Sequence, residues 1–542
     1  MILSTRNRFV ALSLRFFFLL ALIPAIFTSA TISPVPYITS ISPISAAPGG
    51  AQFTLTVNGA NFVASSVVKW NATALTTTFV SADKLTAVVP ATLIVTGGTG
   101  HLTVVNSTLV SNVFFFPVGA PISTITTAAL SATVGNGASA VATADLNADG
   151  NLDLIVSNRI SGTVSALLGN GDGTFQAQKL FTAISAPWGI AVGDLNGDGI
   201  PDLIVGNLGT GLNIALGNGD GTFTVTSINV GNCPLNPVLA DVNGDGKLDI
   251  IVGNECGSGI LVFLGNGNGT FQAPTTLNGS TDVYSLVVAD FDGDGILDIV
   301  AANRITSTID VYKGTGSGNF AAVVQYPALA GAWSIAAADF NGDAKLDLVV
   351  TSSSGVGIAV LLGNGDATFQ AATFVATTGS YYAVETGDLN TDGKQDIVTL
   401  TSTTVQAWPG NGNGTFQVPQ SMGSVFNDYA LALGNFQTAG GLGAASTSTG
   451  TANIFVPTAL LTPATQPFGS ISVGASTQQV FTLTNSTSLT LAISAITFTG
   501  TNPTDFTELD TCATPLPSGG TCAVTVTFTP AASGARLSLI HI

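Results

Sequence analysis

The sequence has few positively charged residues. Its 542 residues include 13 Lys and Arg against 31 Asp and Glu, so the formal net charge is −18. A basic footprint for nucleic acid is therefore absent. Histidine is also scarce, because His101 and His541 are the only two and neither is close in sequence to the acidic repeats. We expect no Ser-His-Asp or Cys-His catalytic arrangement and interpret both histidines as surface residues.

Helical periodicity is scarce as well. After residue 30, few windows place apolar residues at i, i+3 and i+4, whereas Gly, with 63 residues, and Thr, Ser and Val are abundant. This composition is typical of strands and turns. Every later apolar stretch carries polar or Gly interruptions. We therefore predict an all-β protein with no membrane insertion after the N-terminal segment.

The first 30 residues have the pattern of an export signal. Three arginines precede an apolar run at 16–27, and small residues follow at 28–30. The run is short for a membrane span. We predict a signal peptide at 1–30 and a protein that is secreted or at the cell surface by bacterial-type export. An uncleaved anchor is the alternative.

Four cysteines are present, and three pairings are possible in principle. They are Cys233, Cys256, Cys512 and Cys522. Local pairing, 233 with 256 and 512 with 522, is the simplest arrangement in an exported protein, where disulfides form. Free buried thiols are the alternative.

One acidic nonapeptide recurs through the middle of the chain. It reads DLNADGNLD at its first copy, and its copies begin at Asp145, Asp194, Asp241, Asp290, Asp339 and Asp388. The steps between these aspartates are 49, 47, 49, 49 and 49 residues. A fixed period of this length indicates a repeat architecture. The six copies hold 19 of the 31 acidic residues, so the acidity is concentrated in one motif.

Each repeat contains four short strand-like segments. In the second unit these are 188–192, 203–205, 211–216 and 224–230, and the third ends in GNGDGTF at 217–223. Four short strands per unit of this length form one blade of a β-propeller. The glycines of the GNGxGTF element permit a tight turn, and its Phe can pack between blades.

A seventh unit keeps the period without the carboxylates. Aligning 432–444 on the loop places Asn435, Gln437, Ala439 and Gly443 at the acidic positions. This unit has a third strand at 452–456 and no fourth, whereas a spare strand at 122–130 precedes the first unit. If the spare strand completes the seventh blade, the ring closes without an exposed edge. We therefore predict seven blades over residues 119–458.

The nonapeptide has the ligand pattern of a hard cation site. Oxygen-bearing side chains stand at positions 1, 3, 5 and 9, position 7 can offer its backbone carbonyl, and Gly at position 6 permits the turn. Three or four carboxylates per site suit Ca²⁺ better than Mg²⁺, and zinc would require His or Cys. An EF-hand is excluded because position 12 is never Glu. Solvated acidic turns without metal are the alternative.

The predicted calcium sites number up to six and are structural. Their residues are Asp145, Asn147, Asp149, Asn151 and Asp153; Asp194, Asn196, Asp198, Ile200 and Asp202; Asp241, Asn243, Asp245, Lys247 and Asp249; Asp290, Asp292, Asp294, Ile296 and Asp298; Asp339, Asn341, Asp343, Lys345 and Asp347; and Asp388, Asn390, Asp392, Lys394 and Asp396.

These loops resemble the FG-GAP/VCBS repeat of integrin α-subunit propellers and of many exported bacterial proteins. The resemblance implies Ca²⁺ at the first turn of each blade. It is weaker at the Asp339 unit, where Ala344 replaces Gly, so we expect a strained turn there. The seventh unit is expected to bind no metal.

The flanking segments resemble two families of β-sandwich. Residues 31–118 are similar to TIG/IPT immunoglobulin-like domains through ITSISP at 38–43, PGG at 48–50, LTVNGANF at 55–62 and LTAVVP at 85–90. Residues 459–542 are similar to ASPM/SPD-2/hydin-type (choice-of-anchor) domains through 461–474, 481–486 and 518–530. That resemblance also implies a Cys512–Cys522 pair, and we expect this domain to be incomplete. The predicted fold is all-β, a seven-bladed β-propeller flanked by two immunoglobulin-like sandwiches.

Aromatic residues recur six positions before the loops. They are Trp188, Tyr284, Trp333, Tyr382 and Tyr429, while Ser139 and Leu235 occupy this position in the other two units. The start of the first strand lies at the opposite end of the blade from the metal loop, so these side chains are expected around the channel mouth. The resemblance to integrins makes them a candidate partner-binding ring. Packing between blades is the alternative.

Three functions fit these features. We favour a non-enzymatic, calcium-stabilised module that binds an extracellular protein or glycan, with the sandwiches as spacers or anchors. A polysaccharide lyase on the same scaffold is the second, with Arg159 and Arg304 as the basic residues to inspect. A purely structural surface spacer is the third.

Overall fold

A computed structural model describes most of the chain after the expected export signal at 1–30, which lies outside the described residues. The described residues are 33–541 without 120–124, 126, 184–185, 210, 232, 426–429, 438–440, 458, 463–467, 486–490, 492, 494–495, 500, 513–514, 518 and 537. Their regular structure is strand, apart from two 3₁₀ turns, η1 (Ala91–Leu93) and η2 (Pro503–Asp505), so the all-β prediction is confirmed. In this described part, no helix has the length and apolarity to cross a membrane.

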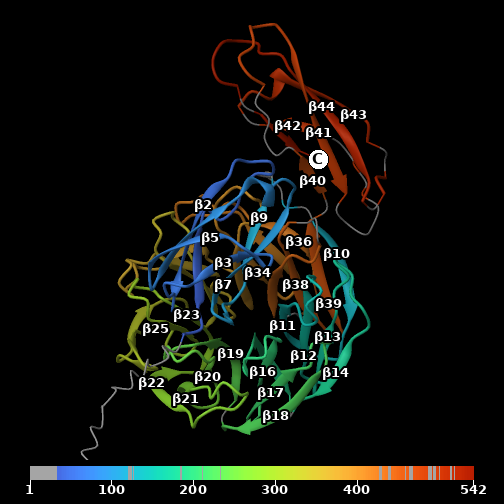
Figure 1. Ribbon diagram of the computed structural model, residues 1–542. Coiled ribbons are helices and arrows are strands. Elements are labelled where there is room, and N and C mark those ends of the chain that lie inside the picture. The colour runs from blue at the N-terminus through green and yellow to red at the C-terminus, as the bar shows by residue number, and fades with distance from the viewer. Residues whose placement is uncertain are drawn as a thin grey trace, which may run out of the picture. The chain divides into compact units, whose positions relative to one another are not determined.

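Seven four-stranded antiparallel sheets lie between Thr127 and Pro457 in the described residues (Figure 1). In order they are β11 (Ala138–Ala144), β12 (Asp153–Asn158), β13 (Thr163–Leu167) and β14 (Lys179–Thr182); β15 (Pro187–Gly193), β16 (Asp202–Asn207), β17 (Gly211–Gly217) and β18 (Phe223–Asn229); β19 (Pro234–Ala240), β20 (Asp249–Asn254), β21 (Ser258–Phe263) and β22 (Thr275–Thr281); β23 (Val283–Ala289), β24 (Asp298–Asn303), β25 (Thr308–Tyr312) and β28 (Val324–Pro327); β29 (Ala332–Ala338), β30 (Asp347–Ser352), β31 (Ile358–Leu361) and β32 (Thr373–Ala376); β33 (Ala383–Gly387), β34 (Asp396–Leu400), β35 (Thr404–Trp408) and β36 (Gln420–Ser424); and β37 (Leu431–Gly434), β38 (Gly443–Ser448), β39 (Thr451–Pro457) and β10 (Thr127–Thr133). A small hairpin, β26 (Gly314–Gly316) with β27 (Asn319–Phe320), extends the fourth unit.

Burial along each sheet explains its sequence. All six residues of the second strand β16 are buried, because neighbouring sheets cover both of its faces, and it reads as a continuous apolar run. The outer strand β18 instead alternates between half-buried and exposed positions. The apolar cores are therefore continuous between consecutive sheets, as expected of propeller blades.

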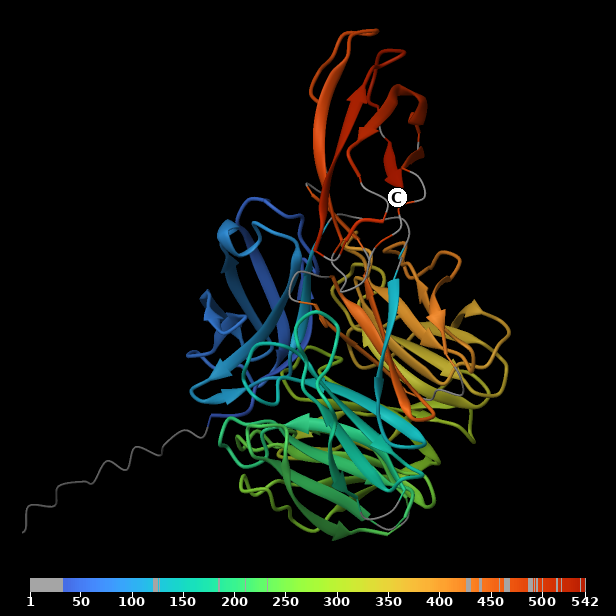
Figure 2. The ribbon, with the colours of Figure 1, turned by 90° about the vertical axis from the view of Figure 1, so that its right-hand side faces the viewer.

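The propeller closes by pairing the two ends of its chain. Each first strand contacts the first strand of the next sheet, and β37 contacts β11. Strand β10 pairs with β39 from Thr127↔Pro457 to Thr133↔Thr451, and Figure 2 shows it beside the last sheet. The spare strand expected at 122–130 is thus found at 127–133, and the start of the expected segment lies mostly outside the described residues. The N-terminal strand supplies the outer edge of the last sheet, as the sequence predicted.

The N-terminal sandwich (Tyr37–Val118) packs two sheets around one core. The first sheet is β1 (Tyr37–Ser42), β2 (Phe53–Ala60), β6 (Lys84–Val89) and β5 (Thr76–Ser81). The second is β4 (Thr73–Ala74), β3 (Val67–Trp70), β7 (Gly98–Asn106), β8 (Leu109–Val110) and β9 (Phe114–Val118). Leu55 and Phe116, from opposite sheets, belong to the same buried core.

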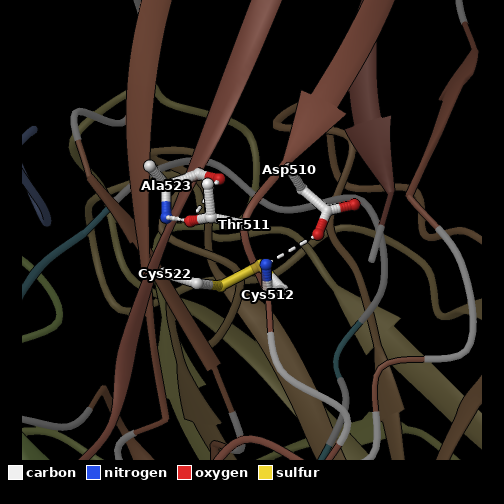
Figure 3. Close-up of a disulfide and its surroundings, with 5 residues drawn as sticks. All are labelled: Asp510, Thr511, Cys512, Cys522 and Ala523. Atoms are coloured by element: carbon white, nitrogen blue, oxygen red, sulfur yellow. Dashed lines mark hydrogen bonds between the residues drawn. A yellow bond between two sulfur atoms is a disulfide. The ribbon is translucent and has the colours of Figure 1, made fainter.

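The C-terminal sandwich (Ala459–His541) has the sheet β40 (Ala459–Thr462), β41 (Thr477–Asn485), β44 (Thr521–Phe528) and β43 (Phe506–Asp510) and the pair β42 (Thr497–Thr499) with β45 (Leu539–His541). Val524 and Leu483 are fully buried in its core. The same domain contains the Cys512–Cys522 disulfide, with the two Cα atoms 4.9 Å apart (Figure 3).

Both locally paired disulfides are present, which confirms the simplest pairing of the four cysteines. Cys233 and Cys256 join the start of β19 to the turn after β20, with their Cα atoms 5.3 Å apart. Beside the second disulfide, the Cys512 backbone N–H donates to Asp510 Oδ1 at 2.7 Å, and the Ala523 N–H donates to Thr511 Oγ1 at 3.0 Å (Figure 3). Free buried thiols are thereby excluded.

Candidate metal centres and binding face

Each acidic loop curls around the carboxylate at its first position. In the second unit, Asp194 Oδ1 accepts from the Gly197 N–H at 2.7 Å and the Asp198 N–H at 3.2 Å. Asp194 Oδ2 accepts from the Gly199 N–H at 2.8 Å. These bonds turn the chain so that the side chains at positions 3 and 5 face the same centre, where Asn196 Nδ2 donates to Asp198 Oδ2 at 2.9 Å. The arrangement follows from nine consecutive residues and needs no distant contact.

The turn requires left-handed backbone at position 6, which explains the glycine there. Gly199 has φ +82°, and Ala344 adopts the same conformation with φ +64°. The Ala344 N–H still donates to Asp339 Oδ2 at 2.8 Å, so the loop of the fifth unit keeps its shape with a residue that disfavours it. The expected strained turn is therefore present.

The fourth loop brings the most carboxylates together. Oxygens of Asp290, Asp292 and Asp294 lie within 4.8 Å of one another. The Lys313 ammonium contacts Asp292 and lies 3.5 Å from Asp294 Oδ2. A protein cation thus stands beside this oxygen cluster, and the donor set consists of the hard oxygens that a divalent cation prefers. The residues of this loop fit a metal site.

The aspartate at position 9, a predicted metal ligand, also forms structural hydrogen bonds that the motif does not reveal. In the fourth unit, Asp298 Oδ2 accepts from the Phe291 N–H at 3.0 Å, and Asp298 Oδ1 accepts from the Gly314 N–H at 2.7 Å. The same two bonds recur at the other fully buried position-9 residues, Asp153, Asp202, Asp249, Asp347 and Asp396. Each carboxylate therefore joins the acidic loop to the turn between the third and fourth strands.

That turn also connects neighbouring blades. The Gly318 N–H donates to the Val242 carbonyl of the preceding loop at 3.2 Å, and the Gly414 N–H donates to the Phe340 carbonyl at 2.9 Å. The Phe of the turn packs on the same preceding loop, as Phe416 does on Phe340 with ring centroids 5.4 Å apart. The loop thus holds its own blade and the next one together.

Burial disfavours the charged form of the position-9 carboxylates. It raises the pKa of Asp249 to about 7 and the pKa of Asp396 to about 8, with nearby loop carboxylates adding to the shift and backbone N–H donors opposing it. The pKa of Asp298 is raised to about 7 for the same reason. A cation bound among these groups would offset both the burial of the charged carboxylates and the repulsion between them.

These shifts predict how the stability of the calcium-free protein varies with pH. A carboxyl group whose folded pKa lies above its unfolded value of about 4 stabilises the fold at low pH, and this contribution is lost as pH rises through the folded pKa. With Asp249 at about 7 and Asp396 at about 8, we expect the melting temperature in metal-free buffer to fall between pH 5 and pH 8. Calorimetry after treatment with a chelating resin measures this. Rising stability over the same range in the metal-free protein would contradict it.

In the seventh unit, the described loop positions carry no carboxylate. Gln437 N–H donates to Asn435 Oδ1 at 3.3 Å, and Gly443 begins strand β38. Ala439, which was aligned with position 5, lies outside the described residues. The described positions offer amide oxygens and no carboxylate, so the donor set is poorer than in the other six loops.

The N-terminal sandwich and the residues just before it form hydrogen bonds to two of the loops. The Val35 N–H donates to Asp241 Oδ2 at 2.9 Å, and Asn61 Nδ2 donates to the Asp241 carbonyl at 2.9 Å. Ser45 hydrogen-bonds the Asp388 carboxylate. Asp241 and Asp388 are each 2% exposed, whereas the first aspartates of the other loops are less buried. No motif in the sequence predicted this contact.

The aromatic residues do converge at the other end of the blades. Trp188 Nε1 donates to Tyr284 Oη at 2.7 Å, although the two residues are two units apart. Tyr284 stacks on Trp333 with ring centroids 3.8 Å apart, and Trp333 meets Tyr382 edge-on at 6.4 Å. Tyr429 lies outside the described residues. The sequence-based grouping therefore corresponds to one cluster of side chains.

Burial divides this cluster into an inner and an outer part. Trp188 and Tyr284 are 8% and 6% exposed and pack with Leu235, which occupies the same position in the unit between them. Trp333 and Tyr382 are half-buried. The first pair therefore fills the centre of the propeller, and the second pair retains accessible surface.

Two arginines cover the cluster from the turns after the second strands. The guanidinium carbon of Arg159 lies 5.0 Å from the centroid of Trp188, and that of Arg304 lies 5.5 Å from the centroid of Trp333. Arg304 also pairs with Asp282 at 2.7 Å. Ile160 and Ile305, the next residues in each turn, are 65% and 68% exposed. We call these arginines and isoleucines, with Trp333 and Tyr382, the aromatic face.

Neither histidine takes part in these sites. His101 is half-buried on β7, and its ring meets Phe115 edge-on at 5.3 Å. Burial lowers the pKa of His101. This differs from the expected surface position, because His101 lies beside Phe115, which packs against a hydrophobic core of the propeller. His541 ends strand β45.

The fold and the loops together define a β-propeller in which six units carry an acidic loop, rich in oxygen donors, at their first turn. Family models agree with this description. The FG-GAP-like repeat matches residues 145–205, 194–252, 241–301, 290–350 and 339–399, the IPT/TIG domain matches 36–118, and the HYDIN/CFA65/VesB-like, Ig-like domain matches 457–540. The chain therefore contains five FG-GAP-like repeats, with an IPT/TIG domain before them and a HYDIN/CFA65/VesB-like, Ig-like domain after them, as the motifs indicated.

Solved structures show more distant similarity. One describes the specific recognition of non-reducing terminal N-acetylglucosamine by an Agrocybe aegerita lectin; it is 21% identical, covers 65% of this chain and 94% of that chain, and has a TM-score of 0.41. A functionally unknown protein from Desulfotomaculum acetoxidans is 11% identical over 60% and 95% of the two chains, with a TM-score of 0.40. An auxiliary nutrient binding protein from Bacteroides ovatus is 12% identical over 67% and 94%, with a TM-score of 0.27. No curated protein matches the chain.

Proposed function

We propose that this protein is an exported binding module whose propeller is stabilised by Ca²⁺ and whose aromatic face binds an extracellular protein or glycan. The observation that carries the proposal is the aromatic face itself. Trp, Tyr and Arg are the residues that dominate binding energy at recognition surfaces. Here they stand together with two exposed isoleucines at the end of the blades opposite the acidic loops.

Calcium has a structural part in this proposal. The six acidic loops would hold the ion through their position 1, 3, 5 and 9 side chains and the position 7 carbonyl. The bound ion would supply positive charge that offsets carboxylate repulsion and fixes each loop against its neighbours. Export agrees with the two disulfides, which form in oxidising compartments.

The same geometry argues against the lyase alternative. A catalytic base must be unprotonated before it can accept a proton, whereas an arginine stays protonated in proteins. Arg304 is held by Asp282 and Trp333, and Arg159 packs on Trp188. We therefore propose no catalytic role for these residues. Cleavage of a polysaccharide by the purified protein, abolished by one arginine substitution, would overturn this view.

The aromatic face can be tested without damaging the core. The double substitution Ile160→Ser with Ile305→Ser is expected to change the unfolding free energy by less than about 0.5 kcal/mol per site, because both side chains are exposed. It should reduce binding on a glycan array, or to a captured protein partner, at least about tenfold. Val418→Ser, which changes a side chain that is 82% exposed in the turn after β35, is the matched control.

Trp188 is not a suitable probe of binding. It is 8% exposed and bonded to Tyr284, so Trp188→Ala should destabilise the fold by about 3–5 kcal/mol. Tyr382→Ala tests the accessible part of the cluster instead. If the isoleucine variant and Tyr382→Ala bind as the unaltered protein does, the aromatic face is not the binding surface.

A further inference from the structure

A cavity of about 350 Å³ lies between the N-terminal sandwich and the inner strands of the propeller. Its walls come from the β8–β9 segment of the sandwich and from the first strands of the sixth, seventh and first units. Phe114, Phe115 and Leu431 are among its apolar lining residues. The volume is within the range of small-molecule sites, about 300–1,000 Å³.

Two polar residues in this wall depart from the repeat. Glu385 stands three residues before its loop, where the other units have Ala or Val: Ala142, Ala191, Val238, Val287, Ala336 and Ala432. Gln395 stands at position 8 of the same loop, where the other units have Leu or Pro: Leu152, Pro201, Leu248, Leu297, Leu346 and Leu442. Both departures fall in the sixth unit, and both side chains line the one cavity.

Among the described residues, the side-chain oxygens of Glu385 and Gln395 have no hydrogen-bond partner. Gln395 is 9% exposed, and its Oε1 has no hydrogen-bond partner among the described residues. No hydrogen bond or ion pair of the Glu385 carboxylate is found in that part of the chain either. A buried acceptor without a donor destabilises the fold, and more so when it is charged. The other units have apolar residues at both positions, so the fold of a unit does not require this pair.

The cavity has acidic character. Its lining includes the Glu385 carboxylate, which is not one of the predicted calcium ligands, and contains no Lys, Arg or His among the described residues. Glu385 is half-buried and lines the cavity. The surrounding protein therefore removes part of the water around its carboxyl group. Burial raises the pKa of Glu385 to about 7. A positively charged ligand beside this group would restore its ordinary ionisation.

We propose that this cavity binds a small organic cation, a primary amine with an apolar body, through the Glu385 carboxylate, with the Gln395 side chain in the polar part of the same lining. The ammonium group offers three N–H donors, which suits the two oxygens of one carboxylate. The apolar body would lie against Phe114, Phe115 and Leu431. The site is separate from the aromatic face and does not depend on it.

The test uses the full chain in calcium-containing buffer, with butylamine, butanol and butyrate as probes of equal length. Isothermal titration or saturation-transfer NMR should show butylamine binding at least about tenfold more tightly than the other two, since a hydrogen bond between charged groups is stronger than one between neutral groups. Equal binding of all three would reduce the site to an apolar cavity and overturn the proposal.

Substitutions then assign the binding to the two residues. Glu385→Gln should lower the butylamine affinity about tenfold or more, and Gln395→Leu, which restores the residue of most other units, should lower it about threefold. Glu255→Gln, at another half-buried glutamate, is the matched control and should change nothing. A bromine-labelled alkylamine located by anomalous scattering gives a second readout. Unchanged affinity in Glu385→Gln, or bromine density elsewhere on the protein, contradicts the assignment.

Discussion

Removal of calcium is expected to lower the melting temperature of this protein by about 10 °C or more. A site filled at about 100 times its dissociation constant stabilises the fold by about 2.7 kcal/mol. In domains of 150–250 residues, each kcal/mol shifts the melting temperature by about 2–4 °C. Several of the six loops acting together therefore give a large change. Scanning calorimetry with and without EDTA measures it.

Controls separate calcium from other effects of chelation. Adding Ca²⁺ back should restore the melting temperature, and Mg²⁺ should restore less of it, because Mg²⁺ holds its water more tightly. Asp292→Asn with Asp294→Asn should reduce the calcium effect by weakening the fourth loop, whereas Asn435→Ala in the seventh unit should leave it unchanged. An identical melt in calcium-free and calcium-loaded buffer would show that the loops are not metal sites.

Replacing a position-9 aspartate is expected to destabilise the protein even without metal. Asp298→Ala removes the acceptor for the Phe291 and Gly314 N–H groups and leaves both donors buried. A buried donor left without an acceptor costs about 1–3 kcal/mol, so the loss for the two N–H groups should be about 2–6 kcal/mol. Urea unfolding in EDTA-containing buffer measures this without the contribution of calcium.

The matched control is a carboxylate in the same loop. The Asp294 side chain is 36% exposed and accepts one backbone bond, from the Ile296 N–H at 2.9 Å. In the same metal-free buffer, Asp294→Ala should cost about 1 kcal/mol or less. With calcium present, both substitutions should weaken binding. Equal losses for the two variants in EDTA would mean that position 9 acts only as a metal ligand.

The local features of this fold could be predicted because short segments encode them. The Asp194 loop forms through bonds to residues three to five positions ahead, so its ligand pattern is readable from nine letters. The strands around it follow from apolar runs between two glycine-rich turns. The closing pair β10–β39 was also predictable. The seventh unit has no fourth strand of its own, and an unassigned strand precedes the first unit.

Other features depend on how the ring brings distant units together. The Trp188–Tyr284 hydrogen bond joins residues 96 positions apart and passes over Leu235 in the unit between them. The spacing of the aromatic residues predicted a ring around a channel. Only the curvature of the blades decided that two of these side chains fill the centre and two remain accessible.

The cavity shows the same division in another way. The two departures from the repeat, Glu385 and Gln395, are visible in the aligned units, and that comparison could have singled them out. Only the structure shows that they line a cavity together with the sandwich strand β9, which lies more than 250 residues earlier in the chain.

The sequence by itself determined the class of fold, the acidic loops, the closing strand and the disulfide pairs, because each depends on residues close in the chain or on the fixed period. The tertiary structure alone decided which loops the N-terminal sandwich covers, what the aromatic residues contact and which residues line the cavity. Those contacts join segments that no local periodicity relates, and they exist only after the blades have closed into a ring.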